Sequence, residues 1–456
     1  MGSHMIDSFL FQHVVSTDDM REVWDEKTNV QRLLDVEAAL AKAEAKLGII
    51  PNEAAEEICR KAKFEYINME DVRAGIRKTG HSLVPLLRSL EKACDGDFGQ
   101  YIHYGATTQD IRDTAMVLQL RDARAIILKD LEGLRTELIA LIRKYKDTPV
   151  AGRTHGQQAL PITFGFKAAV WLDEVQRNID RLVESKDRLL VGNMTGAVGS
   201  YASFGDLGRA VEKEVMDSLG IGTPAICWHA ARDRFAEFLS ILALTASTCA
   251  RIGQEIFNLQ ATEVDELEEA FTEGKVGSST MPHKRNPGTC EVIMSMAKMV
   301  RGNAAVMTQV MEQEHERDGA QWRTEWAIIP ETCQYAGCCV RFCKNLVANL
   351  KVKPEKMRKN LDILKGLLLS ERVMFTLADK VGKQHAHELV YELSMKAFEN
   401  DIYLKDALLA DPRTKELLTA EEIDKALDPA NYLGLCEEVA LKVASLCEEK
   451  ANASNS

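Results

Sequence analysis

One short segment of the chain carries the residue types for acid–base chemistry on an anion. Residues 277–287 read Gly-Ser-Ser-Thr-Met-Pro-His-Lys-Arg-Asn-Pro. Glycine lets a backbone approach a ligand closely, and the two prolines oppose helix formation inside the segment. We therefore predict a mobile loop, rich in backbone N–H donors, in which the hydroxyls of Ser278 and Ser279 lie near the positive charge of Lys284. A polar surface turn would explain the glycine and the serines, but not the complete run.

Three other segments combine a histidine with turn or hydroxyl residues. They are residues 80–82 (Gly-His-Ser), residues 103–110 (His-Tyr-Gly-Ala-Thr-Thr-Gln-Asp) and residues 152–157 (Gly-Arg-Thr-His-Gly-Gln). Histidine titrates near neutrality, so each ring is a candidate acid or base. The second segment places hydroxyls and an amide at a predicted helix start, which favours carboxylate binding, and Arg153 in the third has a guanidinium suited to an anion. Taken singly, each histidine is more simply explained as structural, because the spacing does not bring them together.

The loop at residues 277–287 resembles the GSSxMPxKxNP loop of the fumarase/aspartase superfamily, which includes adenylosuccinate lyases, argininosuccinate lyases and 3-carboxy-cis,cis-muconate cycloisomerases. His81, His103 and His155 match the three histidine positions of the adenylosuccinate lyase patterns TxH, HYGxTSxD and RTHGQ. Four separated segments therefore match in chain order, and the resemblance covers nearly the whole chain.

The resemblance implies roles for individual residues. Ser278 is the expected general base, with Ser279 and His81 as the other candidates, and His155 is the expected general acid. Glu291 is expected to pair with a catalytic histidine. The implied substrate-binding residues are His103, Thr107, Thr108, Gln109, Arg153, Thr154, Ser279, Met281, Lys284, Asn286 and Arg317.

The implied reaction is an anti β-elimination from a succinyl group, which leaves fumarate. A proton leaves the carbon next to a carboxylate, and the resulting dianion needs cations and N–H donors around it. Lys284 and Asn286 are expected to hold one carboxylate, and Thr107 and Thr108 to bind a carboxylate oxygen. Serine acts as a base only where such donors stabilise its alkoxide, whereas a histidine tuned by a carboxylate protonates the leaving nitrogen or sulfur.

The chain departs from adenylosuccinate lyases where those enzymes bind the nucleotide phosphate. Their N-terminal Arg-Tyr pair is absent from residues 11–16, which read Phe-Gln-His-Val-Val-Ser. Their HERDISHSSxER segment is replaced at residues 315–326 by His-Glu-Arg-Asp-Gly-Ala-Gln-Trp-Arg-Thr-Glu-Trp, which is similar to the cycloisomerase branch. Bacterial cycloisomerases of that branch, however, typically lack histidines where His81 and His155 stand.

Trp322 and Trp326 in place of phosphate ligands predict a smaller and drier pocket. We therefore predict a lyase that releases fumarate from a succinyl adduct of a small amine or thiol, such as an N- or S-succinyl amino acid. Adenylosuccinate cleavage is the first alternative, with Arg323 serving the phosphate from a shifted position, and cycloisomerisation of carboxymuconate is the second. A third is a catalytically silent structural protein of the kind this superfamily supplies to eye lenses. The complete loop and the three histidines count against it.

The bulk properties restrict the partners. A net charge of -12 over 456 residues argues against nucleic acid or an anionic membrane as the main partner, but not against a small anionic substrate. Met1 to His4 read as a cloning remnant, and no signal peptide follows. The eleven cysteines are odd in number and include no Cys-x-x-Cys pair, which predicts free thiols in a reducing cytoplasm. We expect no metal and no cofactor, since no metal-ligand spacing or nucleotide-binding glycine motif is present.

Long segments without a helix breaker predict an all-α fold. Residues 113–147, 237–259 and 290–313 are the longest, and the first shows the three-and-four spacing of a bundle helix. Residues 16–19 (Ser-Thr-Asp-Asp) predict the N-cap of a helix that runs to Gly48. Strand signals are scarce, because no sustained alternation is bounded by turn residues.

We place domain boundaries near residues 108 and 355. They separate an N-terminal helical domain (1–107), a central bundle of long helices (108–355) and a C-terminal helical domain (356–456). The helix predicted at 237–259 is apolar on every face, so it needs neighbours from further copies of the chain. The resemblance implies a five-helix central bundle, a homotetramer with a twenty-helix core, and active sites each built from three subunits.

Overall fold

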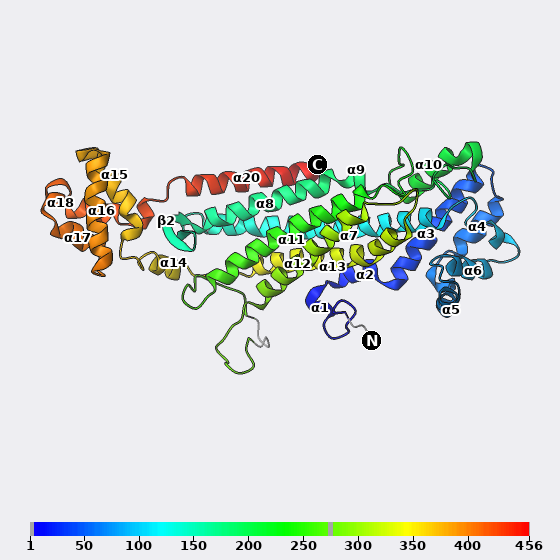
Figure 1. Ribbon diagram of the computed structural model, residues 1–456, viewed down its shortest axis with the longest axis horizontal. Coiled ribbons are helices and arrows are strands. Elements are labelled where there is room, and N and C mark those ends of the chain that lie inside the picture. Colours follow the sequence, from blue (N-terminus) through cyan, green and yellow to red (C-terminus); the bar gives the residue numbers. More distant parts are fainter. Residues whose placement is uncertain (1–3, 272–276, 456) are drawn as a thin grey trace. The chain divides into compact units, whose positions relative to one another are not determined.

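The computed structural model describes residues 4–271 and 277–455, and this part of the chain is helical almost throughout (Figure 1). It contains twenty α-helices and four short strands, which confirms the predicted all-α class. The residues form two compact units, each made of separate segments of sequence. Unit 1 comprises residues 1–131, 178–249 and 292–341, and unit 2 comprises residues 132–177, 250–291 and 342–456. The predicted domain boundaries at residues 108 and 355 stay a prediction.

Five long helices supply segments to both units. They are α7 (Thr108–Lys144), α8 (Phe164–Glu184), α11 (Asp233–Leu259), α12 (Gly288–Val310) and α13 (Gly319–Ala348). Within unit 1, Arg341 of α13 donates to Asp130 of α7 at 2.6 Å, and Asn178 of α8 donates to Thr248 of α11 at 2.8 Å. The predicted helices at 113–147, 237–259 and 290–313 are thereby confirmed with shifted ends.

The N-terminal part of unit 1 consists of shorter helices. They are α1 (Gln12–Val15), α2 (Asp18–Trp24), α3 (Glu26–Lys46), α4 (Asn52–Lys61), α5 (Met69–Thr79) and α6 (Val84–Ala93), with α10 (Gly208–Leu219) packed on α3. The single helix predicted from residue 16 to Gly48 is wrong, since Asp25 has extended backbone and interrupts it. The Asp25 side chain accepts a hydrogen bond from the Thr28 N–H at 2.6 Å and so begins α3.

A β-hairpin in unit 2 lies outside what the sequence predicted. Strand β1 (Pro149–Thr154) pairs antiparallel with β2 (Gln157–Thr163) across the two residues His155 and Gly156, which have φ of 51° and 77°. Positive φ at both central residues is typical of the tight turns whose twist matches paired strands. The hairpin therefore presents His155 at its tip. A second, two-residue pair joins β3 (Leu267–Glu268) to β4 (Lys351–Val352).

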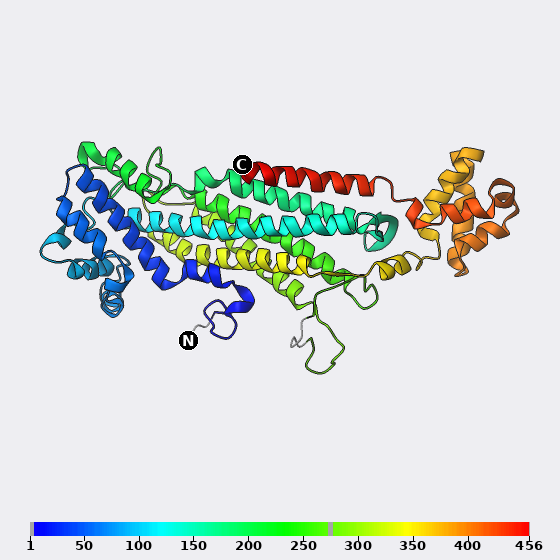
Figure 2. The same cartoon turned by 180° about the vertical axis from the view of Figure 1, so that it is seen from behind.

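The C-terminal part of unit 2 is a cluster of short helices followed by one longer helix, visible in orange and red in Figure 2. They are α14 (Pro354–Asn360), α15 (Ser370–Val381), α16 (Lys383–Glu399), α17 (Leu404–Ala410), α18 (Pro412–Leu417), α19 (Ala420–Ala426) and α20 (Cys436–Asn455). Leu377, Leu393 and Leu408 are buried in the core of this cluster.

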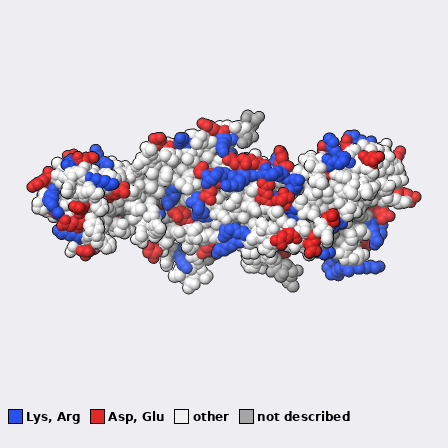
Figure 3. Space-filling view, turned by 45° about the horizontal axis from the view of Figure 1, so that its top comes forward, with Lys and Arg blue, Asp and Glu red and all other residues white. Residues whose placement is uncertain are grey.

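Helix α11 is apolar enough and long enough to cross a membrane, but 61% of its most apolar window is buried inside the protein. Core helices of water-soluble proteins meet the same criteria, so burial argues for a core helix. Leu244 on this helix is nevertheless 50% exposed in the single chain. All eleven cysteines are free. On the face drawn in Figure 3, basic and acidic side chains lie next to one another.

Candidate functional site

The loop that carries Ser278 lies in unit 2, directly before helix α12, and contains no helix between residues 277 and 287. The Ser278 hydroxyl oxygen accepts hydrogen bonds from the backbone N–H groups of Thr280 at 3.3 Å and Met281 at 3.1 Å. Two N–H donors aimed at one oxygen stabilise negative charge on it. They therefore favour the alkoxide form that a serine needs in order to act as a base.

Ser279 has no such arrangement. Its exposed hydroxyl approaches only the Thr280 hydroxyl, at 3.5 Å. Of the two serines proposed as the base, only Ser278 has backbone donors directed at its oxygen in the described part of the chain.

Neighbouring residues fix the shape of this loop. A side chain at Gly277 would collide with the backbone of Lys284, so the two ends of the loop pass each other at a distance that only glycine permits. Arg285 forms an ion pair with Glu268 and lies over the Phe271 ring, 4.9 Å from its centre. Gln260 donates to the Arg285 carbonyl at 3.0 Å. The loop is thus attached to unit 2 through Arg285, which leaves its tip free.

The other predicted residues of this segment are accessible. The exposed side chains are those of Met281, Lys284, Asn286 and Glu291. The Lys284 N–H closes a turn on the Met281 carbonyl at 3.0 Å, and Glu291 lies in the first turn of α12. Lys284 and Asn286 thus present a cation and an amide to solvent, as binding of an external carboxylate requires.

The hairpin of unit 2 presents Thr154 and His155, both exposed. A non-glycine residue with positive φ is strained, and such residues gather at functional sites. Arg153 differs from the prediction in one respect. Its guanidinium forms a two-point ion pair with the fully buried Glu266, at 2.9 Å and 2.7 Å. Its guanidinium is therefore already paired, and it holds the hairpin next to its tip.

In unit 1, the predicted carboxylate cradle is formed at the start of α7. Arg317 donates to the Gln109 side-chain oxygen at 2.8 Å, to the Thr107 hydroxyl at 3.2 Å and to the Ala197 carbonyl at 2.8 Å. Thr108 is the first residue of the helix, where free N–H groups attract anions. The structure thus brings Arg317 to the predicted segment that contains Thr107, Thr108 and Gln109. Arg317 lies 208 residues from Gln109 and 210 residues from Thr107 in the sequence.

His103 lies beside this cradle in the same unit, with φ of 60°. Its Nδ1 is 2.8 Å from Oε1 of Glu37, a carboxylate that is 1% exposed. Burial disfavours the charged ring, but the Glu37 charge and hydrogen bond outweigh it and raise the pKa of His103. The Glu37 carboxylate thus orients this ring and favours its cationic form.

His81 has a defined ring orientation. Its Nδ1 accepts hydrogen bonds from the Leu83 N–H at 3.2 Å and the Val84 N–H at 3.1 Å, at the start of α6. A neutral His81 ring therefore carries its proton on Nε2, where it donates rather than accepts. This arrangement suits binding of an anionic oxygen better than removal of a proton.

The buried carboxylate of Asp110 belongs to the predicted segment 103–110, but its partners were missed in the sequence. Asp110 accepts from the backbone N–H groups of Thr195 at 3.0 Å and Gly196 at 2.9 Å, and its Oδ1 is 2.9 Å from Nε2 of His229. Burial opposes the charge on His229, yet the contact with Asp110 raises its pKa to about 9. The two segments are 119 residues apart, so no local pattern linked them.

A second buried group lies one turn further along α7. Arg232, which is fully buried, donates to Asp113 at 2.7 Å and to Glu325 at 2.7 Å. Asp113 also accepts from the indole N–H of Trp322 at 3.0 Å. These contacts fix the helix that follows Arg317. Arg232 lies 119 residues from Asp113 and 93 residues from Glu325 in the sequence, so no local pattern linked them.

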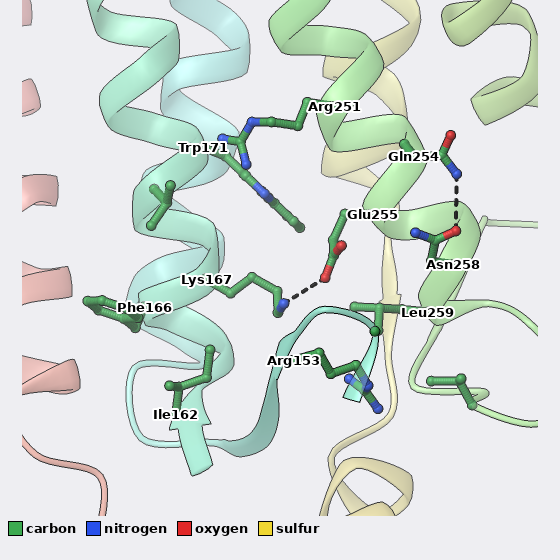
Figure 4. A pocket seen from close by; sticks show the side chains of 13 residues that line it. Arg153, Ile162, Phe166, Lys167, Trp171, Arg251, Gln254, Glu255, Asn258 and Leu259 are labelled. Atoms are coloured by element: carbon green, nitrogen blue, oxygen red, sulfur yellow. Dashed lines mark hydrogen bonds and ion pairs between the residues drawn. The ribbon is translucent and has the colours of Figure 1, made fainter. Parts of the chain in front are cut away.

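A cavity of about 720 Å³ in unit 2 lies beside the hairpin (Figure 4). Its charged residues all have ion-pair partners: Lys167 lies 2.6 Å from Glu255, and Arg153 pairs with Glu266, which does not line the cavity. The two side chains point at each other in Figure 4, and Arg251 forms an ion pair with Glu174. Cations that already have carboxylate partners attract a dianion weakly, so we do not place the reaction there. In the described residues no three His, Cys, Asp or Glu side chains converge as a metal site requires.

The predicted residues are thus divided between the two units. Unit 1 holds His81, His103, Thr107, Thr108, Gln109 and Arg317, and unit 2 holds Arg153, Thr154, His155, Ser278, Ser279, Met281, Lys284, Asn286 and Glu291. His103, His155 and His315 all have positive φ. Each of them lies in a segment that the sequence had singled out, so backbone strain coincides with the predicted chemistry.

Comparisons with known proteins identify relatives of this chain. A family model described as "Lyase" matches residues 12–302, and one described as "Adenylosuccinate lyase C-terminus" matches residues 366–443. An N-acetyl-S-(2-succino)cysteine lyase of Dickeya dadantii is 47% identical, covering 95% of both chains. An adenylosuccinate lyase of Pyrococcus abyssi is 41% identical, covering 98% of this chain and 99% of the other. The crystal structure of the 3-carboxy-cis,cis-muconate lactonizing enzyme from Pseudomonas putida superimposes with a TM-score of 0.92 at 35% identity, covering 97% and 99%.

Proposed function

The chain belongs to the lyase family of the fumarase/aspartase superfamily, in the adenylosuccinate lyase and carboxymuconate cycloisomerase branch, and we propose that its substrate is a small S-succinyl amino acid. It is a fumarate-releasing enzyme, which sets aside a purely structural role. The substrate class we propose is the thioether N-acetyl-S-(2-succino)cysteine. The observation that carries this proposal is the 47% identity, over 95% of both chains, to a lyase named for that substrate.

The proposed reaction breaks one carbon–sulfur bond. Ser278 removes a proton from the succinyl carbon next to a carboxylate, and Lys284 and Asn286 stabilise the dianion that forms. The electron pair then forms the fumarate double bond while the thiolate departs from the neighbouring carbon. His155 protonates the leaving sulfur, giving fumarate and N-acetylcysteine. The two N–H donors on the Ser278 oxygen support its role as the base.

We further propose that the unit 1 cradle binds the carboxylate of the succinyl group that does not lie against the Ser278 loop. Arg317, Thr107 and the free N–H groups at Thr108 supply the donors for it. His103 and His81 complete the proposed contacts to the anionic substrate, and Glu291 is proposed to pair with a catalytic histidine.

Groups from the two units would meet in a homotetramer, in which one active site takes residues from three subunits. This assembly is part of the proposal. It is supported by the 50% exposure of the apolar Leu244 side chain on helix α11 and by the family resemblance.

Adenylosuccinate cleavage is the second candidate, favoured by the 41% identical relative. Arg323, the residue considered for its phosphate, is exposed and donates only to the Gly319 carbonyl at 3.4 Å in the described part of the chain, so it is free to bind one. The packing near Arg323 argues against adenylosuccinate as the substrate. Trp322 and Trp326 lie on the same helix, α13, with ring centres 4.9 Å apart. Two packed indoles leave less room than a nucleotide needs.

A substrate panel tests the choice. The enzyme is incubated with N-acetyl-S-(2-succino)cysteine, an N-succinyl amino acid, adenylosuccinate and 3-carboxy-cis,cis-muconate, and initial rates are recorded for each. We expect the thioether to have the highest kcat/KM. Adenylosuccinate as the best substrate would replace the proposal with the second candidate, and lactone formation from carboxymuconate would identify a cycloisomerase.

A further inference from the structure

A cavity of about 450 Å³ in unit 1 is lined in part by Arg112, a cation that forms no ion pair within the described residues. It lies between α3, α5 and α6 and reaches the first turns of α7. Apolar side chains, among them Leu33, Val72 and Leu86, form part of its wall. Arg112 of α7 also lines it and borders a smaller cavity of about 60 Å³ next to Trp322 and Trp326.

The Arg112 guanidinium is held in place by groups that carry no charge. Its Nε donates to the Ser82 hydroxyl at 3.1 Å, and one terminal nitrogen lies 3.4 Å from the Ser82 carbonyl oxygen. The Arg112 guanidinium lies over the Trp326 ring, 4.3 Å from the ring centre. In the described part of the chain no carboxylate forms an ion pair with it, and its second terminal nitrogen has no hydrogen-bond partner.

The carboxylate of Asp113, the next residue in the chain, already has other hydrogen-bond and ion-pair partners. Asp113 accepts from Arg232 through both oxygens, and from Gln109 and Trp322 as well. Burial lowers the pKa of Arg112 to about 10, with Asp113 opposing the change, so the group is still charged at neutral pH. A part-buried charge without a partner is costly unless a ligand supplies the opposite charge.

Arg112 is close to the candidate site. It lies four residues beyond Thr108 on α7, and residues with this spacing share a helix face. Ser82, its hydrogen-bond acceptor, directly follows His81 in the chain. The cation is thus attached both to the helix that begins the carboxylate cradle and to the segment that presents the His81 ring.

We propose that Arg112 binds the carboxylate of the leaving amino acid, that is, the carboxylate of the N-acetylcysteine portion and not those of the succinyl group. This inference rests on the proposed function and adds a third anion-binding point to it. A guanidinium with free N–H groups recognises a carboxylate through two parallel hydrogen bonds. The apolar wall formed by Leu33, Val72 and Leu86 then receives the acyl group, whose methyl gains by leaving water.

The experiment compares two thioethers that differ only in this carboxylate. N-acetyl-S-(2-succino)cysteine has it, and N-acetyl-S-(2-succino)cysteamine has a hydrogen in its place. Fumarate release is measured for the wild type, Arg112→Met and Arg112→Lys. The control is Arg73→Met, because Arg73 lines the same cavity but is exposed and lies 3.8 Å from Glu70.

We expect Arg112→Met to lose roughly 10- to 100-fold in kcat/KM on the cysteine compound, the size of a charged hydrogen-bonding contact. On the cysteamine compound it should match the wild type within about twofold, the range in which a lost contact is too small to resolve. Arg112→Lys should retain part of the preference and Arg73→Met all of it. An equal loss on both compounds would assign Arg112 a structural role with Trp326, and no loss on either would also overturn the proposal.

Product inhibition of the wild type gives a result that does not depend on how the variants fold. N-acetylcysteine should inhibit more strongly than N-acetylcysteamine, and equal inhibition would contradict the proposal. Failure of the proposed function is a separate outcome, because the wild type would then release fumarate from neither thioether.

Discussion

At the scale of single residues, the account depends on Ser278. Its oxygen accepts two backbone N–H groups, whereas Ser279 contacts only another hydroxyl. We expect Ser278→Ala to lower kcat by roughly a thousandfold or more, as loss of a positioned catalytic group does. Ser279→Ala is the matched control and should stay within about tenfold of the wild type, since it lacks those donors.

The measurement is the steady-state rate of fumarate release together with substrate affinity. Affinity should change far less than kcat, because the carboxylate contacts of Lys284 and Asn286 remain. Near-normal turnover by Ser278→Ala, or a larger loss in Ser279→Ala, would mean that the base lies elsewhere.

The buried Asp110–His229 pair predicts a pH dependence of stability. The pKa of His229 is raised to about 9 from an ordinary value near 6.5. A raised pKa stabilises the fold fully below the unfolded-state value, and the contribution is lost as the pH rises through the folded-state value. The shift corresponds to about 3 kcal/mol in the free energy of unfolding.

We therefore expect His229→Gln to lower Tm most at pH 6 or below, with the difference from the wild type shrinking as the pH rises through about 9. Thermal unfolding followed by circular dichroism at a series of pH values measures it. His385→Gln, at an exposed histidine of α16, is the control and should show no such trend. A difference that is constant with pH would show that the ion pair does not contribute.

At the scale of the elements, the Ser278 loop depends on Gly277. A Cβ there would meet the Lys284 backbone, whereas a Cβ at Gly288, at the start of α12, would meet nothing within 4 Å. We expect Gly277→Ala to lower kcat/KM by roughly a hundredfold, since a displacement near 1 Å of catalytic groups has that effect. Gly288→Ala should behave like the wild type.

Thermal unfolding separates a loop effect from general instability. Both glycine variants should unfold near the wild-type temperature, because residues 278–286 are mostly exposed and bury little surface. Equal activity of Gly277→Ala and Gly288→Ala would show that the loop shape described above is not needed for catalysis.

The sequence predicted those elements whose signals are local. The three longest helices follow from uninterrupted apolar spacing, and the Ser278 loop follows from its glycine and prolines. The hairpin at residues 149–163 was missed because Gly152 and Pro161 interrupt the alternation that marks a strand. Gly152 is there because a Cβ would meet the Leu160 carbonyl oxygen of the opposite strand.

Within the candidate site, motif residues were predictable but their partners were not. Arg317 and Thr107 belong to recognisable segments, whereas Glu37 and Asp110 take their roles from contacts with His103 and His229. Those contacts join residues 66 and 119 positions apart, so only the folded chain brings them together. The ion pair of Arg153 could not be predicted from the sequence either, because its partner Glu266 lies 113 positions away.

At the scale of the whole molecule, a tetramer with shared sites predicts complementation between inactive variants. Arg317→Ala alters a group of unit 1, and Ser278→Ala alters a group of unit 2. Each should be inactive alone. Co-expressed with different tags and purified through both, they should regain part of the activity, because some sites in a mixed oligomer receive only intact residues.

The control pairs Ser278→Ala with Lys284→Ala. Both changes lie in one loop, so no mixed site would be intact and no activity should return. Sedimentation should show a tetramer for every combination. An active monomer, or doubly tagged oligomers without activity in the Arg317 and Ser278 pair, would contradict the shared site.

The central claim is that this lyase breaks a carbon–sulfur bond of a small S-succinyl amino acid, and the most direct test measures both products of one reaction. The wild type is given N-acetyl-S-(2-succino)cysteine, fumarate is followed by its absorbance, and free thiol is titrated in the same samples. The account predicts one thiol for every fumarate, with kcat/KM above that for adenylosuccinate. No fumarate, fumarate without an equal amount of thiol, or faster cleavage of adenylosuccinate would contradict it.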